Sequence, residues 1–172
     1  MRKFLFFVAC IGWLFGLVVH LLSIVDINLQ DQFPFVWLLH VGIFVVFIPS
    51  AKLLSKNKEL QEFQKSKAPF NINPIKFYKI IFKNTPVWLV ILVLFCFAYG
   101  FFNFLLFMSS QPGSPEIQDG QYILQNHGKL IRTITEQEYH HYKANEVRGF
   151  SGHWLIFYGF SAALLYPFGK GK

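Results

Sequence analysis

The chain has 172 residues, of which 53% are hydrophobic and only 15% are charged, and its formal net charge is +7. About a quarter of the residues of a soluble domain are charged, so this composition indicates an integral membrane protein and argues against a soluble globular domain. The basic balance does not indicate nucleic-acid binding, because the placement of the charges along the chain accounts for it.

Four stretches are long and apolar enough to cross a bilayer, and none contains Asp, Glu, Lys or Arg. They are residues 4–25, 33–51, 86–108 and 150–168. A helix needs roughly 20 such residues to cross about 30 Å of hydrocarbon. The sequence therefore predicts an all-α integral membrane protein, a bundle of four transmembrane helices. The fourth, with Gly159 and Ser161, is the least hydrophobic.

The first stretch, residues 4–25, begins after two basic residues, as a signal peptide does. Its apolar run is too long for a signal core and no small-x-small cleavage site follows it, so we expect the helix to remain in the protein. Gly12 and Gly16 form a GxxxG motif, which lets two helices approach closely, and Ala9 lies on the same face. His20 follows at the same four-residue step, so we expect it to face another helix rather than lipid.

The segment between the second and third spans, residues 52–85, is strongly basic. In its second half, Asn73 and the proline after it suit the start of a helix. Lys76, Lys79 and Lys83 recur on one face and apolar residues occupy the rest. This pattern predicts a short helix lying on the anionic lipid headgroups of the inner interface. The alternative is a solvated basic linker.

The outer segment, residues 109–149, is the only sizeable part expected outside the membrane on that side. It opens with a turn-rich linker, and a β-hairpin is then expected around His127 and Gly128. A helix follows, in which Thr135 and Glu138 form a capping box. We expect this helix to end at a glycine just before the fourth span. The sequence thus predicts a small hairpin-plus-helix cap.

The charges predict an orientation in the membrane. Twelve of the 16 basic residues fall on one predicted side: two before the first span, eight in the basic segment and two at the C-terminus. The positive-inside rule then places both termini in the cytoplasm, as in a bacterial inner (plasma) membrane protein. The predicted divisions are three spans with the cytoplasmic loop 52–85 (1–108), the extracytoplasmic cap (109–149), and the fourth span with a short tail (150–172).

Each predicted span carries one polar group at a similar level, roughly 8 to 11 Å below the outer surface: His20, His40, Asn103 and Tyr158. Polar side chains inside a membrane are costly and are therefore candidates for function. In the structural interpretation the four groups hydrogen-bond one another and stabilise the bundle. In the second interpretation His20 and His40 hold a haem or a divalent metal. In the third, His and Tyr form a quinone, lipid or proton site.

The outer helix offers weaker signals. Glu138 and His141 match half of a carboxylate di-metal motif, which needs two copies and further Glu. Glu136 and His140 are four residues apart and are suited either to chelate a metal or to pair on a solvated face. His153 stands next to a tryptophan at the outer interface, where anchoring or capping is expected rather than ligation.

No phosphate-binding glycine loop and no HExxH, GxSxG or CxxC pattern is present, so nothing in the sequence favours nucleophilic catalysis. We therefore expect a non-enzymatic interaction or accessory subunit without a required cofactor. It would act through the outer cap and the helix face that contains Ala9, Gly12 and Gly16, with the bilayer and a second copy or another membrane protein as partners. The alternatives are a haem- or metal-binding redox protein and an immunity-type or small-solute transport protein.

Overall fold

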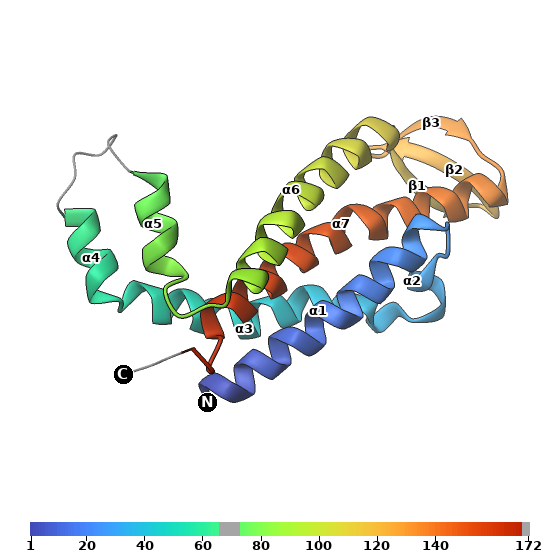
Figure 1. Ribbon diagram of the computed structural model, residues 1–172. Helices are drawn as coiled ribbons and strands as arrows, with labels where there is room; N and C mark the ends of the chain where they lie inside the picture. The colour runs from blue at the N-terminus through green and yellow to red at the C-terminus, as the bar shows by residue number, and fades with distance from the viewer. Residues whose placement is uncertain (66–72, 170–172) are drawn as a thin grey trace.

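The computed structural model describes residues 1–65 and 73–169, and most of them lie in helices (Figure 1). In chain order the elements are α1 (Arg2–Ile24), α2 (Leu29–Gln32), a 3₁₀ turn (Pro34–Trp37), α3 (Leu38–Ser55), α4 (Lys58–Lys65), α5 (Pro74–Ile81), α6 (Val87–Ser110), β1 (Ser114–Gln118), β2 (Gln121–Asn126), β3 (Lys129–Thr133) and α7 (Glu136–Leu165). The sheet lies at one end of the long helices, and α4 and α5 lie at the opposite end.

Three helices of the described chain are long and apolar enough to cross a membrane. They are α1, the segment Pro34–Ser55 that contains α3, and α6. The first three predicted spans are therefore confirmed as long apolar helices. Large apolar side chains on their outer faces, such as Phe15, Phe44 and Phe102, are more than half exposed. A continuous apolar surface of this kind is typical of helices that contact lipid. The fourth predicted span is the second half of α7.

α7 is the central helix and packs against α1, α3 and α6 (Figure 1). Its buried positions in the second half include many small residues: Ser151, Gly152, Gly159, Ser161 and Ala162. Small side chains let neighbouring helices approach closely, and a helix enclosed by others does not need a large apolar surface. The low hydropathy of the 150–168 stretch therefore follows from contact with protein over most of this half of the helix.

The sequence predicted that the outer helix ends before the fourth span, at Gly149. This prediction is wrong, because α7 continues without a break from the cap into the helical core. A glycine inside a helix costs about 1 kcal/mol relative to alanine, unless close packing requires it. Here a Cβ on Gly149 would lie 2.6 Å from the Phe107 ring, and one on Gly152 would lie 2.6 Å from the Asn103 amide. Both glycines therefore let α6 pack directly on α7.

The cap contains a three-stranded antiparallel sheet in the order β1-β2-β3, rather than the two-stranded hairpin predicted from the sequence. β2 and β3 form the predicted hairpin, and β1 lies in the stretch interpreted as a linker. Asp119 and Gly120 join β1 to β2 with φ of 49° and 76°, and His127 and Gly128 join β2 to β3 with φ of 49° and 78°. Positive φ at both positions is the geometry of a tight two-residue hairpin turn.

α4 and α5 pack against each other at the opposite end of the molecule. Leu60 and Phe63 of α4 and Ile80 of α5 form their buried contact. The predicted start of α5 is confirmed, because the Asn73 side chain accepts a hydrogen bond from the Lys76 amide at 3.1 Å. Part of the apolar face predicted to lie on lipid headgroups therefore packs on α4 instead.

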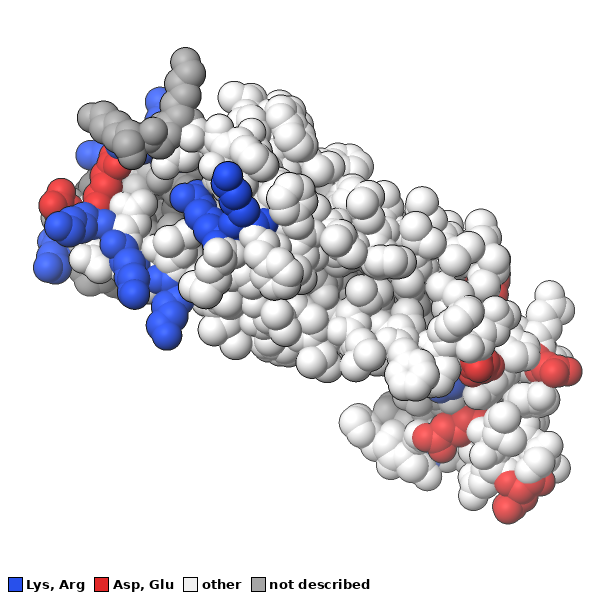
Figure 2. All heavy atoms as spheres, turned by 90° about the horizontal axis from the view of Figure 1, so that it is seen from below, with Lys and Arg blue, Asp and Glu red and all other residues white. Residues whose placement is uncertain are grey.

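Charge is segregated along the long axis, with Lys and Arg gathered at the end formed by α4 and α5 and most Asp and Glu at the sheet end (Figure 2). We call these the basic end and the cap end. Lys76, Lys79 and Lys83 are all exposed at the basic end. The Lys76 ammonium lies 5.7 Å from the centre of the Phe63 ring, and Lys83 pairs with Glu59 at 2.8 Å.

Candidate functional site

A chain of hydrogen bonds runs through His20, whose side chain is only 1% exposed. Its Nδ1 lies 2.7 Å from the Ser151 hydroxyl and its Nε2 lies 2.6 Å from the Tyr99 hydroxyl. The Ser151 hydroxyl in turn donates to the Arg148 carbonyl at 3.2 Å. One proton arrangement satisfies every group: Tyr99 donates to Nε2, Nδ1 donates to Ser151, and Ser151 donates to the carbonyl. His20 therefore joins α1, α6 and α7 as a neutral imidazole.

The other three predicted polar groups also form hydrogen bonds that involve α7. His40 Nδ1 accepts from the indole of Trp154 at 3.1 Å. The Asn103 amide donates to the carbonyl of Arg148 at 2.9 Å. The Tyr158 hydroxyl, which belongs to α7, donates to the carbonyl of Leu39 at 2.7 Å. The predicted cluster therefore forms around one central helix.

The structural interpretation expected His20, His40, Asn103 and Tyr158 to bond with one another, and the hydrogen bonds of the described residues do not have that pattern. The reason lies in the packing, since α7 stands between the other helices and receives the bonds that adjacent spans were expected to share. Four separate contacts hold three helices to a fourth. Each such bond contributes about 1 kcal/mol or less between helices in a membrane.

His20 and His40, the two histidines proposed as metal or haem ligands, both take part in hydrogen bonds. Both ring nitrogens of His20 already take part in hydrogen bonds, so ligation would have to break one of them. His40 contacts Trp154, whereas His20 contacts Ser151 and Tyr99. Across residues 1–65 and 73–169, no three or more His, Cys, Asp or Glu side chains are grouped so as to hold a metal ion.

The small-residue face of α1 is turned toward α7. Ala9, Gly12 and Gly16 are buried, and a Cβ added to Gly12 would overlap the Tyr158 ring, at 2.6 Å from its Cζ. A Cβ added to Gly16 would meet Trp154 Cβ at 3.6 Å, which is ordinary contact. Close approach of the GxxxG face thus serves packing inside this chain.

This difference between two glycines one helical turn apart predicts different effects of the same substitution. We expect Gly12→Ala to destabilise the protein by about 1–3 kcal/mol through overpacking against Tyr158. We expect Gly16→Ala to change stability by less than about 0.5 kcal/mol. Thermal unfolding of the two purified variants in detergent measures this difference. Equal melting temperatures for both variants would contradict the packing of α1 on α7.

His140 and His141 join α7 to α2 and to the turn between α1 and α2. His141 Nδ1 donates to Asp26 at 2.8 Å, and His140 lies 3.6 Å from Asp31 and 3.9 Å from Glu136. All five side chains are between 45% and 68% exposed. Solvent-exposed ion pairs contribute little to the free energy of unfolding, so these contacts orient the cap more than they stabilise it.

His153 lies on α7 at the start of the predicted fourth span. Its Nδ1 donates to the carbonyl of Gly149, one turn earlier in the same helix, at 3.0 Å. Its ring meets Phe104 of α6 edge-on, with centroids 5.2 Å apart. These two contacts are a local hydrogen bond and an aromatic packing contact.

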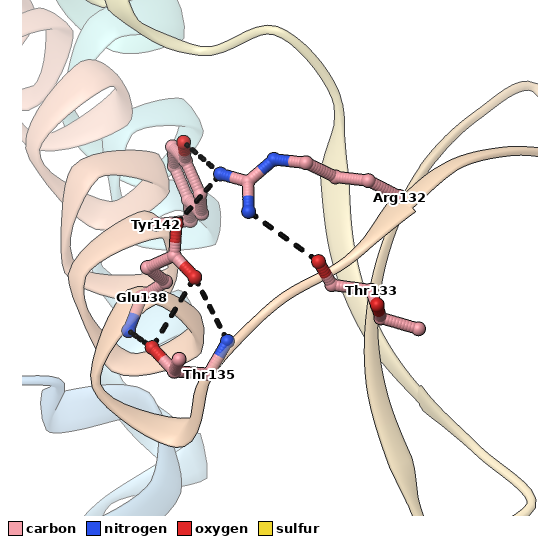
Figure 3. A network of polar contacts seen from close by, with 5 residues as sticks. All are labelled: Arg132, Thr133, Thr135, Glu138 and Tyr142. Atoms are coloured by element: carbon pink, nitrogen blue, oxygen red, sulfur yellow. Dashed lines mark hydrogen bonds and ion pairs between the residues drawn. The ribbon is translucent and has the colours of Figure 1, made fainter.

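Glu138 belongs to a network that fastens the sheet to α7 (Figure 3). The predicted capping box is confirmed: the Thr135 hydroxyl accepts from the Glu138 amide at 3.2 Å, and the Glu138 carboxylate accepts from the Thr135 amide at 2.8 Å. The same carboxylate pairs with Arg132 of β3 at 2.7 Å, and the guanidinium also lies 3.4 Å from the Tyr142 hydroxyl. Of the half di-metal motif, Glu138 therefore caps α7, whereas His141 contacts Asp26.

The charge of Glu138 predicts how this network responds to acid. The Arg132 guanidinium and the Thr135 amide lower the pKa of Glu138 from 4.5 to about 2. Because the pKa of Glu138 is lower in the folded state, its ionised carboxylate stabilises the network fully at pH values above its ordinary pKa of 4.5. This stabilisation is lost as the pH falls from there through about 2. We expect hydrogen exchange of the first turn of α7, corrected for intrinsic rates, to stay equally protected between about pH 8 and pH 6, and to lose protection progressively from about pH 5 downward. Protection that stays unchanged down to about pH 3 would contradict the pairing.

Three residues of the polar core escaped prediction from the sequence: Tyr99, Ser151 and Trp154. Tyr99 lies eleven residues from the outer end of α6, whereas His20 lies four from the end of α1, so counting from helix ends does not pair them. Their contact depends on how far α6 is shifted along α1, which is a tertiary property.

No protein-family model, curated protein or solved structure matches the chain.

Proposed function

We propose that the protein is a four-span integral membrane protein that acts as a non-enzymatic accessory or interaction subunit, with α1, α3, α6 and the second half of α7 as its spans. The pairing of α1 with α7 supports the fourth span. Arg2 at the start of α1 donates to the carbonyl of Leu165 at 3.3 Å, and His20 near its end contacts Ser151. If α1 crosses a membrane, α7 crosses the same thickness beside it.

Charge supports the orientation. The basic end holds the start of α1, the end of α7 and the α4–α5 hairpin, and the cap end carries most of the acidic residues. The positive-inside rule places the basic end, and so both termini, in the cytoplasm. The cap then lies outside the cytoplasm, on the outer face of a bacterial inner or other plasma membrane.

Cysteine labelling of intact cells tests this topology. Cys10 and Cys96 are first replaced by alanine, and one new cysteine is placed at Gln121 in the cap or at Lys58 in the basic end. A membrane-impermeant maleimide is expected to label Gln121→Cys in intact cells, and Lys58→Cys only after the membrane is opened. The reverse pattern would overturn the orientation, and labelling of both in intact cells would overturn the spans.

The proposal of an interaction subunit rests on the exposed edge of β3. All five residues of β3 are exposed, and its side chains Leu130 and Ile131 are 57% and 47% exposed. β1, the other edge, carries Pro115 and packs on α7. In the described part of the chain, β3 pairs only with β2. An unpaired strand edge is a template for another strand, so the partner we propose is an extended segment of another protein's extracytoplasmic part.

Site-specific photocrosslinking in native membranes tests this partner. A photoreactive residue at Ile131 is expected to form an adduct whose partner peptide maps to one extended, alternately apolar segment. The adduct is expected to disappear in a Leu130→Asp background, and the same probe at Gln118 on β1 is the control. Adducts that form equally from Ile131 and Gln118, or only with lipid or a second copy of the chain, would overturn the proposal.

A further inference from the structure

The basic end contains a cavity of about 290 Å³ that no function above uses. It lies where the start of α1, the end of α3, the α5–α6 connection and the end of α7 meet. Three cationic side chains line it, Arg2, Lys56 and Lys83, and no Asp or Glu of the described ranges is among its lining residues. Its volume is near the lower end of the range for small-molecule sites, which suits a compact anionic group.

The three cations are held to different degrees. Arg2 donates to the carbonyls of Leu165 and Tyr166, at 3.3 and 2.8 Å, and so fixes its guanidinium at the end of α7. Lys83 pairs with Glu59, but both side chains are at least half exposed, and such a pair is weak enough for a ligand to displace. Lys56 forms no ion pair with any residue that the structure describes. The cavity thus combines one fixed cation with two available ones.

The rest of the wall is largely apolar. Leucine and isoleucine side chains of three helices contribute Leu53, Leu54, Ile80, Ile81 and Leu164, beside four uncharged polar residues, Ser50, Asn57, Asn84 and Thr85. A free inorganic anion would gain nothing from the apolar part, whereas a ligand with a charged head and an apolar remainder would contact both parts. The wall therefore favours an amphipathic ligand.

We propose that this cavity binds the phosphate group of an anionic phospholipid from the cytoplasmic leaflet. The cavity lies at the end of the long helices where Lys and Arg gather (Figure 2). Basic pockets between helices at the cytoplasmic surface are suited to phosphate headgroups, because charge-assisted hydrogen bonds form there beside apolar chains. A soluble phosphate monoester shares the headgroup chemistry and is the competing source. The proposal uses the four-span orientation and is independent of a partner at β3.

Lipid binding to the purified full chain tests the proposal. The protein is titrated with phosphatidylglycerol or phosphatidylcholine in detergent, and bound lipid is counted by native mass spectrometry. We expect one tightly bound phosphatidylglycerol and no tightly bound phosphatidylcholine. The Lys56→Gln and Lys83→Gln double variant is expected to weaken that binding at least about tenfold, because it removes two charged hydrogen-bond donors.

The matched control is the Lys58→Gln and Lys79→Gln double variant. It removes the same charge from the same end, but neither lysine lines the cavity. We expect its affinity for phosphatidylglycerol to stay within about twofold of the parent protein. Equal loss in both double variants would show diffuse attraction and overturn the site. Unchanged melting temperatures in both variants would exclude unfolding as the cause.

Glycerol 3-phosphate distinguishes the two sources of phosphate. The lipid proposal predicts that millimolar glycerol 3-phosphate neither raises the melting temperature of the delipidated protein nor displaces phosphatidylglycerol. Stabilisation by glycerol 3-phosphate that is lost only in the Lys56 and Lys83 variant would keep the site but overturn the lipid as its ligand. Topology labelling reports separately on the orientation, so failure of one proposal is distinguishable from failure of the other.

Discussion

Replacing Trp154 by alanine is expected to destabilise the protein by about 3–5 kcal/mol, the largest effect of any single truncation that the fold suggests. Trp154 is fully buried at the centre of the helical core. Its ring packs edge-on to Trp37 with centroids 5.8 Å apart, its Cβ faces Gly16, and its indole donates to His40. The variant keeps the Cβ but loses the contact with Trp37 and the hydrogen bond to His40, and it leaves a cavity between α1, α3 and α7.

Trp88→Ala is the control for this prediction. Trp88 lies in the first turn of α6 and is 63% exposed, so the same truncation removes no buried contact. We expect it to change the free energy of unfolding by less than about 0.5 kcal/mol in detergent. Thermal unfolding followed by near-UV circular dichroism measures both variants. Equal destabilisation by the two substitutions would contradict the central place of α7.

The sequence predicts the long helices well because their signal is local. An uninterrupted apolar run of about 20 residues needs no tertiary information, and α1 and α6 follow directly from it. The capping box of Thr135 and Glu138 is equally local, since each side chain bonds with the backbone of the other. Such features depend on spacing along one element, which the sequence displays.

Strand β1, interpreted from the sequence as a linker, also had a local signal. Asp119-Gly120 is among the strongest two-residue hairpin signals, and it places a strand on each side of the turn. The stretch before it contains Pro115, which reads as a linker, but proline is tolerated on an edge strand. β1 is such an edge strand. The prediction therefore failed by giving more weight to composition than to turn geometry.

The polar core could be predicted only in part. Position along a helix follows from the sequence, so His20, His40, Asn103 and Tyr158 are recognised as polar groups within long helical segments, and each has a hydrogen-bond partner in the structure. Their partners depend on which helix is central and on how far each helix is shifted along its neighbour. In the structure α7, which contains the least apolar of the predicted spans, is the central helix. A low hydropathy within a set of predicted spans therefore indicates the enclosed helix.

The contacts of His20 predict an effect on stability. His20→Leu keeps a similar volume but leaves the Tyr99 hydroxyl without its acceptor and removes one bond of Ser151, whose hydroxyl still donates to the Arg148 carbonyl. A polar group that loses its partner costs about 1–3 kcal/mol, so we expect a loss of about 1–3 kcal/mol in thermal unfolding. His153→Leu is the matched control. Its imidazole bonds only within α7, and we expect a loss below about 1 kcal/mol.

A triple variant distinguishes a structural His20 from a ligand-binding one. Adding Tyr99→Phe and Ser151→Ala to His20→Leu removes the two hydroxyls that bonded with the imidazole, so the triple variant is expected to be at least as stable as the single variant. Visible absorption and metal analysis of the parent protein complete the test. A Soret band or a stoichiometric metal that disappears with His20→Leu would show that His20 is a ligand, and the hydrogen-bond chain would then describe only the ligand-free protein. Recovery of stability in the triple variant, together with a colourless and metal-free parent protein, would establish that His20 joins α1, α6 and α7.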